Sequence, residues 1–175
     1  VYALACYFTG RNEQAEKSYI ELAKIRPDSG QSYFALGNFF ADTGRDTEAV
    51  RAFGQAAKIE PDNPLNSYMY GVELVRTQRI PEAAAQLTRA LRLNGKHADS
   101  HYWLGKVNLS QDRREAALVE FEKAEKWEPK HIGACYQLTL LNKRSGNSGK
   151  AREAAEKHAA QDRHCHTGIV AGDEG

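Results

Sequence analysis

The side chains that could bind a metal fall into two groups. His97 and His101 are four residues apart, a spacing that can place two imidazoles on one face of a helix. However, we expect His97 to precede that helix, and no further ligand nearby completes a site. His164–Cys165–His166, with His158 upstream, offers soft-metal ligands, but adjacent residues seldom converge on one ion. We therefore expect no metal site, and we interpret His97 and His101 as solvated histidines at a junction between two helical units.

The sequence contains no recognisable catalytic motif. No glycine-rich phosphate loop, nucleophile elbow or pair of catalytic carboxylates can be placed on a pocket. Acidic residues are plentiful, but runs such as Glu120, Glu122 and Lys126 are typical of the solvated face of a helix. We therefore expect neither enzymatic activity nor a cofactor.

Charge and hydropathy restrict the classes of partner. The 24 Lys and Arg residues nearly balance the 23 Asp and Glu residues, which gives a net charge of +1. Domains that bind a phosphate backbone usually carry a basic excess, so we expect no nucleic-acid partner. No apolar run approaches the length of a membrane span, so we expect no membrane partner either.

The cysteines bear on the compartment. Cys6, Cys135 and Cys165 form no CxxC motif, and we expect Cys6 and Cys135 to lie on helices too far apart to pair. Buried free thiols are commonest in reducing compartments, which favours the cytoplasm. The chain starts at Val1, inside what should be a first helix, and we expect it to be a piece of a longer protein.

A 34-residue period runs through most of the sequence. The window 30–63 contains two amphipathic segments, separated by Gly44 and ended by Pro61. Apolar residues spaced by three, four and seven form one stripe on each segment, as in amphipathic helices. Shifting the window by 34 residues aligns like residues, and such a period is the signature of a repeat architecture. The aligned sets are Leu36 with Tyr70, Leu104 and Leu138; Gly37 with Gly71 and Gly105; Ala49 with Ala15, Ala83, Ala117 and Ala151; and Phe53 with Tyr19, Leu87 and Phe121.

The third unit departs from the pattern at two positions. Gln78 replaces the turn glycine found at Gly10, Gly44 and Gly146, and Gly95 replaces the final proline. If the turn keeps a left-handed residue, Gln78 costs about 1 to 2 kcal/mol relative to glycine. We therefore predict that this unit is the least stable repeat of the array.

The order Tyr33–Leu36–Gly37–Phe40–Ala49–Phe53–Ala56–Pro61 resembles the tetratricopeptide repeat in residue types and spacing. The resemblance implies an all-α fold, a right-handed α-solenoid of antiparallel helix pairs. In its register the array covers residues 1–162: a truncated repeat over 1–29, full repeats over 30–63, 64–97 and 98–131, and a last, capping repeat over 132–162. Residues 163–175 show no periodicity and are predicted to form a disordered tail.

The resemblance also implies a binding surface, because the first helix of each repeat lines the inner, concave face in this family. An aromatic residue falls on that face in each of the last four repeats. These aromatics either pack on neighbouring repeats as family consensus or form a ladder that grips a peptide or helix, and one residue can do both. The predicted groove residues are Phe34, Asn38, Tyr68, Val72, Arg76, Tyr102, Lys106, Tyr136, Lys143 and Arg144.

The family's clamp for a C-terminal carboxylate does not fit this groove. Asn38 matches one clamp asparagine, but Phe34, Val72 and Tyr102 replace other members of the clamp. An asparagine ladder fails as well, because Val72 and Lys106 follow Asn38.

The resemblance implies a non-catalytic scaffold or adaptor that binds a protein or peptide. The alternative is the non-catalytic arm of a larger enzyme or of a secretion or assembly protein, where the array positions or dimerises another domain. We expect a monomer, or a weak homodimer through Tyr2, Leu4 and Tyr7 of the truncated first helix. The partner itself cannot be named from the sequence.

Overall fold

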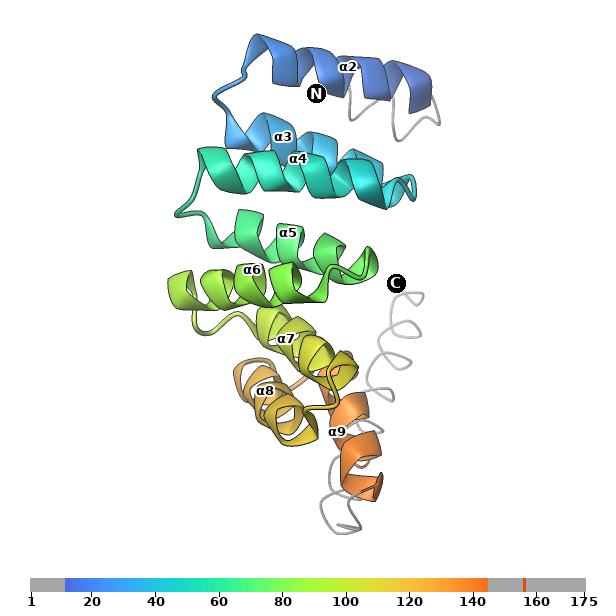
Figure 1. Ribbon diagram of the computed structural model, residues 1–175, viewed down its shortest axis with the longest axis vertical. Coiled ribbons are helices and arrows are strands. Elements are labelled where there is room, and N and C mark those ends of the chain that lie inside the picture. Colours follow the sequence, from blue (N-terminus) through green and yellow to red (C-terminus); the bar gives the residue numbers. More distant parts are fainter. Residues whose placement is uncertain (1–11, 145–155, 157–175) are drawn as a thin grey trace, which may run out of the picture. The chain divides into compact units, whose positions relative to one another are not determined.

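The structure is a computed structural model, and it describes residues 12–144 and Glu156 (Figure 1). The described residues form eight α-helices and no strand, which confirms the predicted all-α fold class. The predicted helix at 1–9, the last helix at 150–161 and the tail at 163–175 lie outside the described residues. The helices are α2 (Asn12–Ile25), α3 (Gly30–Asp42), α4 (Asp46–Ile59), α5 (Pro64–Arg76), α6 (Ile80–Leu93), α7 (Ala98–Ser110), α8 (Arg114–Trp127) and α9 (Ile132–Arg144).

The chain divides into two compact units, Val1–Gly95 and Lys96–Gly175. In the first unit, α2 packs on α3, α3 on α4, α4 on α5 and α5 on α6. In the second unit, α7 packs on α8 and α8 packs on α9. Within each unit, consecutive helices pack as the 34-residue period predicts. None of the described helices has the length and apolarity of a membrane span.

Side chains at a 34-residue spacing accept a hydrogen bond from the first turn of three helices. Asn63 caps α5 by accepting a bond from the Leu65 amide at 3.1 Å, and Pro64 occupies the first turn. His97 caps α7 through Nδ1, which accepts from the Ser100 amide at 3.2 Å. His131 Nδ1 accepts from the Ala134 amide at 3.0 Å at the start of α9.

The turn inside each helix pair keeps one residue in the left-handed region. Its φ is 73° at Gly44, 61° at Gln78 and 54° at Asp112. The turn therefore keeps its left-handed residue at Gln78, which is the condition under which a cost was expected there. Gln78 adopts this backbone at the expense of a Cβ clash that glycine avoids.

The two helices of a pair approach closely where the repeat places its glycine. A Cβ built on Gly37 would lie 2.8 Å from the Phe53 ring, and one on Gly105 would lie 2.6 Å from the Phe121 ring. Both aromatic rings are fully buried. A glycine is therefore required at the crossing because a bulky side chain of the second helix fills the space above it.

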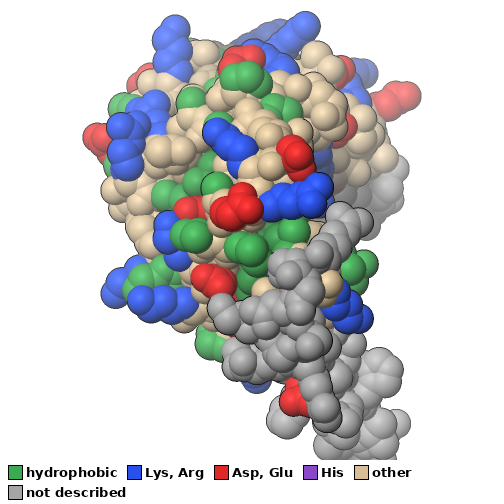
Figure 2. Space-filling view, turned by 60° about the horizontal axis from the view of Figure 1, so that its bottom comes forward, with side chains coloured by type: hydrophobic (Ala, Val, Ile, Leu, Met, Phe, Trp, Pro, Cys, Tyr) green, Lys and Arg blue, Asp and Glu red, His purple; other side chains and the backbone are tan. Residues whose placement is uncertain are grey.

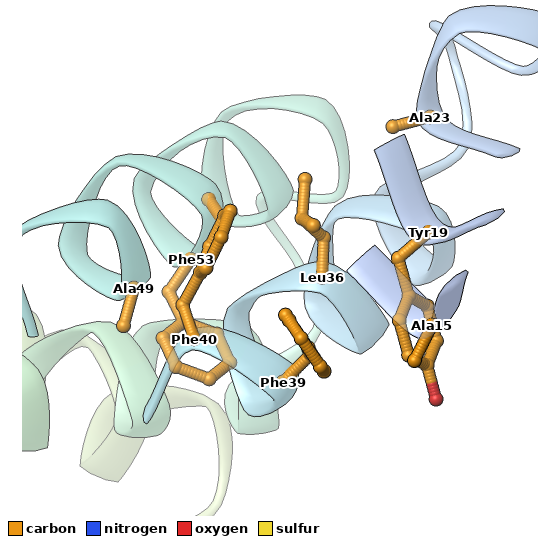
Figure 3. Close-up of a cluster of buried hydrophobic side chains, with 9 residues drawn as sticks. Ala15, Tyr19, Ala23, Leu36, Phe39, Phe40, Ala49 and Phe53 are labelled. Carbon is orange, nitrogen blue, oxygen red and sulfur yellow. The ribbon is translucent and has the colours of Figure 1, made fainter. Parts of the chain in front are cut away.

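The core of the first unit is continuous from α2 to α4 (Figure 3). Phe39 of α3 lies between Tyr19 of α2 and Phe40, with ring centroids 5.5 and 5.8 Å away. Ala15 and Ala49 are also fully buried in this cluster, because small residues let the helices approach. One helix pair thus buries its apolar stripe only when the neighbouring pair is present.

Candidate functional site

The predicted aromatic ladder consists of side chains that differ in how far they are covered. Phe34 is half-buried, and its ring meets Phe53 edge-on with centroids 5.5 Å apart. Tyr68 is half-buried as well. Tyr136, in contrast, is exposed, with 52% of its surface accessible. Phe34 therefore packs against the core of its unit, whereas at α9 the aromatic side chain is accessible.

Tyr102 shows how a following repeat covers this position. Its ring lies 5.8 Å from Phe121 and 4.8 Å from the imidazole of His131. A Cβ on Gly133 of α9 would lie 2.9 Å from the same ring, so α9 closes over Tyr102. This burial raises the pKa of the Tyr102 phenol.

The remaining predicted groove residues are divided between the two units. In the first unit Asn38 is half-buried, Val72 is buried, and Arg76 is exposed and paired with Glu73. In the second unit Lys106 is half-buried and Lys143 is exposed, whereas the side chain of Arg144 lies outside the described part. None of the ion pairs in the described part of the chain involves either lysine.

Tyr136, Leu140 and Lys143 share one face of α9, because their spacings are four and three residues. Leu140 is 37% exposed beside the exposed Tyr136. This face therefore offers an aromatic ring, an aliphatic side chain and an ammonium group along two turns of one helix.

The histidines that looked solvated in the sequence are structural. His101 is 6% exposed, and its Nδ1 lies 2.6 Å from Oε2 of Glu120 on α8. The predictions of a solvated His101 and an outward Glu120 are therefore wrong. Glu122 and Lys126 of the same run are exposed, as predicted. The pair was missed because its members are 19 residues apart and meet only when α7 packs on α8.

Lys123 completes this cluster, since its Nζ donates to Oε1 of Glu120 at 2.7 Å. Burial alone would raise the pKa of Glu120, but the hydrogen bonds from His101 and Lys123 outweigh it and lower that pKa. Within residues 12–144, no three His, Cys, Asp or Glu side chains are placed to hold a metal. His158 and His164–Cys165–His166 lie outside the described residues.

One charged residue that the sequence analysis did not single out is buried in the first unit. Glu73 of α5 is 1% exposed, and its Oε1 lies 3.2 Å from Nη1 of Arg76. Its position in the repeat corresponds to Phe39, Val107 and Leu141, all of them buried and apolar. Comparing every position across the 34-residue period, rather than only the consensus positions, would have revealed it.

Comparison with known proteins places these features in a family. A family model described as tetratricopeptide repeat matches residues 3–64 and 68–129. No curated protein matches the chain.

Among solved structures, the crystal structure of MamA has a TM-score of 0.85 at 21% identity, covering 94% of this chain and 96% of MamA. PilW, a widely conserved type IV pilus biogenesis factor, has a TM-score of 0.79 at 19% identity, with 93% and 75% covered. YrrB, a repeat protein with an unusual peptide-binding site, has a TM-score of 0.73 at 22% identity, with 91% and 82% covered. At these identities the likeness establishes the fold.

Proposed function

The chain belongs to the tetratricopeptide repeat family, and from that premise we propose that it binds a peptide segment or helix along the first helices of its repeats. The membership supports a protein-interaction scaffold in general terms. The observation that carries the finer proposal is the face of α9 formed by Tyr136, Leu140 and Lys143. Exposed aromatic side chains beside apolar ones are typical of the centres of protein interfaces.

The proposed mechanism is passive recognition by a preformed surface. Because α3, α5, α7 and α9 are ordered by packing within their units, a ligand would cause little loss of entropy in the protein. In the second unit, Tyr136 and Leu140 of α9 would provide contact area, since α9 covers Tyr102. In the first unit, the accessible parts of Phe34 and Tyr68 would do so, and the Asn38 amide would bond to the ligand backbone. No group transfer takes place in this scheme, and it needs no cofactor.

Charge favours a peptide that carries acidic groups near one end. Lys106 and Lys143 have no ion-pair partner in the described part of the chain, so a ligand carboxylate would gain an interaction without breaking one. Figure 2 shows hydrophobic side chains interspersed with side chains of both charges. This mixture, with a net charge of +1, favours a protein partner over nucleic acid.

The test is to titrate a library of fluorescent peptides, acidic, neutral and basic, against the wild type and Tyr136→Ala. Tyr136 is exposed, so its truncation should leave the fold intact and weaken binding of the best peptide about tenfold, as for a moderate hot spot. Val119→Ala is the matched control, because Val119 is exposed to a similar extent but lies on the second helix of its repeat. Unchanged affinity for Tyr136→Ala, or no binding by any peptide, would refute the groove proposal.

A second candidate is that the array positions another domain within a larger assembly. The likeness to PilW, a pilus biogenesis factor, favours this function. Reading the coding sequence upstream of Val1 distinguishes the two candidates. An adjoining catalytic or secretion domain would support the positioning role, and its absence would favour the scaffold.

A further inference from the structure

A carboxylate occupies an apolar position in the core of the first unit. The residue one period before Glu73 is Phe39, and those one and two periods after it are Val107 and Leu141. All three are buried hydrophobic side chains, and Glu73 is buried to the same degree. α5 packs against α4 and also touches α3, so the array places a titratable group where other repeats place a hydrocarbon.

The surroundings of Glu73 satisfy only part of its bonding capacity. Its Oε1 pairs with Arg76 at 3.2 Å, whereas Oε2 is buried and accepts no hydrogen bond from any described residue. Almost half of the Arg76 side chain is exposed, so water screens the one opposing charge. Burying an ionised carboxylate with one oxygen that accepts no hydrogen bond costs free energy. Protonation removes the charge and with it most of this cost.

The other charges that act on Glu73 come from α3 and α4. Burial raises the pKa of Glu73, Arg76 opposes this, and the carboxylates of Asp46 and Asp42 raise the pKa further. Asp46 is at the start of α4 and Asp42 at the end of α3. No charged side chain of α6 is among the groups that influence Glu73 in the described helices.

We propose that Glu73 makes the packing of α5 against α3 and α4 depend on pH, so that the first unit is tightest when this carboxyl is protonated and loosens when it ionises. Ionisation leaves the side chain two options, admitting water to Oε2 or swinging toward Arg76. Either response separates α5 from the helices that it covers. This inference concerns the packing of the array and does not rest on the proposed peptide groove.

The direction of the pH dependence follows from linkage. The folded-state pKa of Glu73 is raised above its ordinary value of about 4.5. Its contribution to stability is therefore fully present below that value and is lost as the pH rises through the folded-state pKa. Glu120 acts in the opposite sense, because its pKa is lowered and its contribution is lost when the pH falls.

The experiment compares urea denaturation of the wild type and Glu73→Gln from about pH 5 to about pH 9. Gln keeps the size and hydrogen-bonding groups of a protonated Glu but cannot ionise. We expect the urea midpoint of the wild type to shift downward with rising pH relative to that of Glu73→Gln. Glu122→Gln on the exposed face of α8 is the matched control and should follow the wild type at every pH.

Two further measurements test whether the effect arises from the packing of α5 against α3 and α4. Hydrogen exchange, corrected for the intrinsic pH dependence of exchange, should show faster opening of α4 and α5 at high pH in the wild type, with no such change in α8. Glu73→Leu, which introduces the residue found at Leu141, should show the flat pH profile of Glu73→Gln. Parallel midpoints for the wild type and Glu73→Gln across this range would overturn the proposal. The proposal would also be overturned if the urea midpoint of the wild type rose relative to that of Glu73→Gln with increasing pH. Such a rise would show that ionised Glu73 forms a stabilising ion pair with Arg76.

Discussion

At Gly105 the backbone of α7 lies so close to α8 that no side chain fits. A methyl group there would lie 2.6 Å from the ring of Phe121, which is fully buried. Overpacking of this kind costs about 1 to 3 kcal/mol, whereas Ala gains about 1 kcal/mol over Gly in helix propensity. We therefore expect Gly105→Ala to lower the free energy of unfolding by up to about 2 kcal/mol, as measured by urea denaturation.

Gly54→Ala in α4 is the matched control for that substitution. Its Cβ would lie 3.2 Å from the ring of Tyr70, which is only half-buried and can shift. The gain in helix propensity should then dominate, so this variant should be as stable as the wild type or more stable. Equal stability of the two alanine variants would show that the crossing at Phe121 is not tightly packed.

Individual residues also show where sequence reasoning succeeded and where it failed. The period aligned Gly37 with Gly71 and Gly105, and the structure shows that Gly37 and Gly105 lie where the two helices of a pair approach closely. It could not identify the pair of His101 and Glu120, since their contact depends on how α7 packs on α8. Glu73 was visible as a deviation from the period, but its missing hydrogen-bond partner is a property of the packed structure.

Among the elements, the turns inside the helix pairs carry a measurable strain. Gln78 adopts a φ of 61°, and Gly44 at the same position of the preceding repeat has a φ of 73°. Replacing Gln78 by Gly removes a left-handed penalty of about 1 to 2 kcal/mol, while the greater freedom of Gly in the unfolded chain costs about 0.4 to 1 kcal/mol. We expect Gln78→Gly to raise the free energy of unfolding by about 1 kcal/mol, as measured by urea denaturation.

Gly44→Gln is the reverse substitution at the equivalent turn. No atom lies within 4 Å of a Cβ at Gly44, so packing does not distinguish the variant from the wild type. The same two opposing terms, backbone strain and the freedom of the unfolded chain, remain. It should lose about as much stability as Gln78→Gly gains. If both substitutions destabilise the protein, backbone strain at this turn does not control its stability.

The element boundaries show why some helix starts were predictable and others were not. Asn63 followed by Pro64 is a recognised start signal, and α5 begins there. His97 and His131 cap the starts of α7 and α9 in the same way, but histidine is not among the preferred capping residues. Their role follows only from their alignment with Asn63 in the 34-residue period, which the sequence analysis did not use for the caps.

At the scale of the whole molecule, stability in a repeat array is a sum of local terms, and a weak repeat opens by itself. α5 buries three polar side chains, Asn66, Ser67 and Glu73, whereas Ser32 is the buried polar side chain of α3. Ser67 Oγ and Glu73 Oε2 have no hydrogen-bond partner among the described residues, and each such buried group costs about 1 to 3 kcal/mol. The pair α5–α6 thus combines unsatisfied polar groups with a strained turn.

We therefore expect the amides of α5 and α6 to exchange with solvent faster than those of α3 and α4. The measurement is native-state hydrogen exchange, and any ionisation of Glu73 at the pH of the measurement would add to the other defects. Combining Glu73→Gln with Gln78→Gly should remove two of these defects, leaving the unsatisfied Ser67 Oγ and Gln86 Oε1. It should therefore reduce the difference between the pairs, because the two sites act on different groups. Slower exchange in α5–α6 than in α3–α4 of the wild type would show that helix packing compensates for these defects, and would contradict the low stability predicted for this repeat from Gln78.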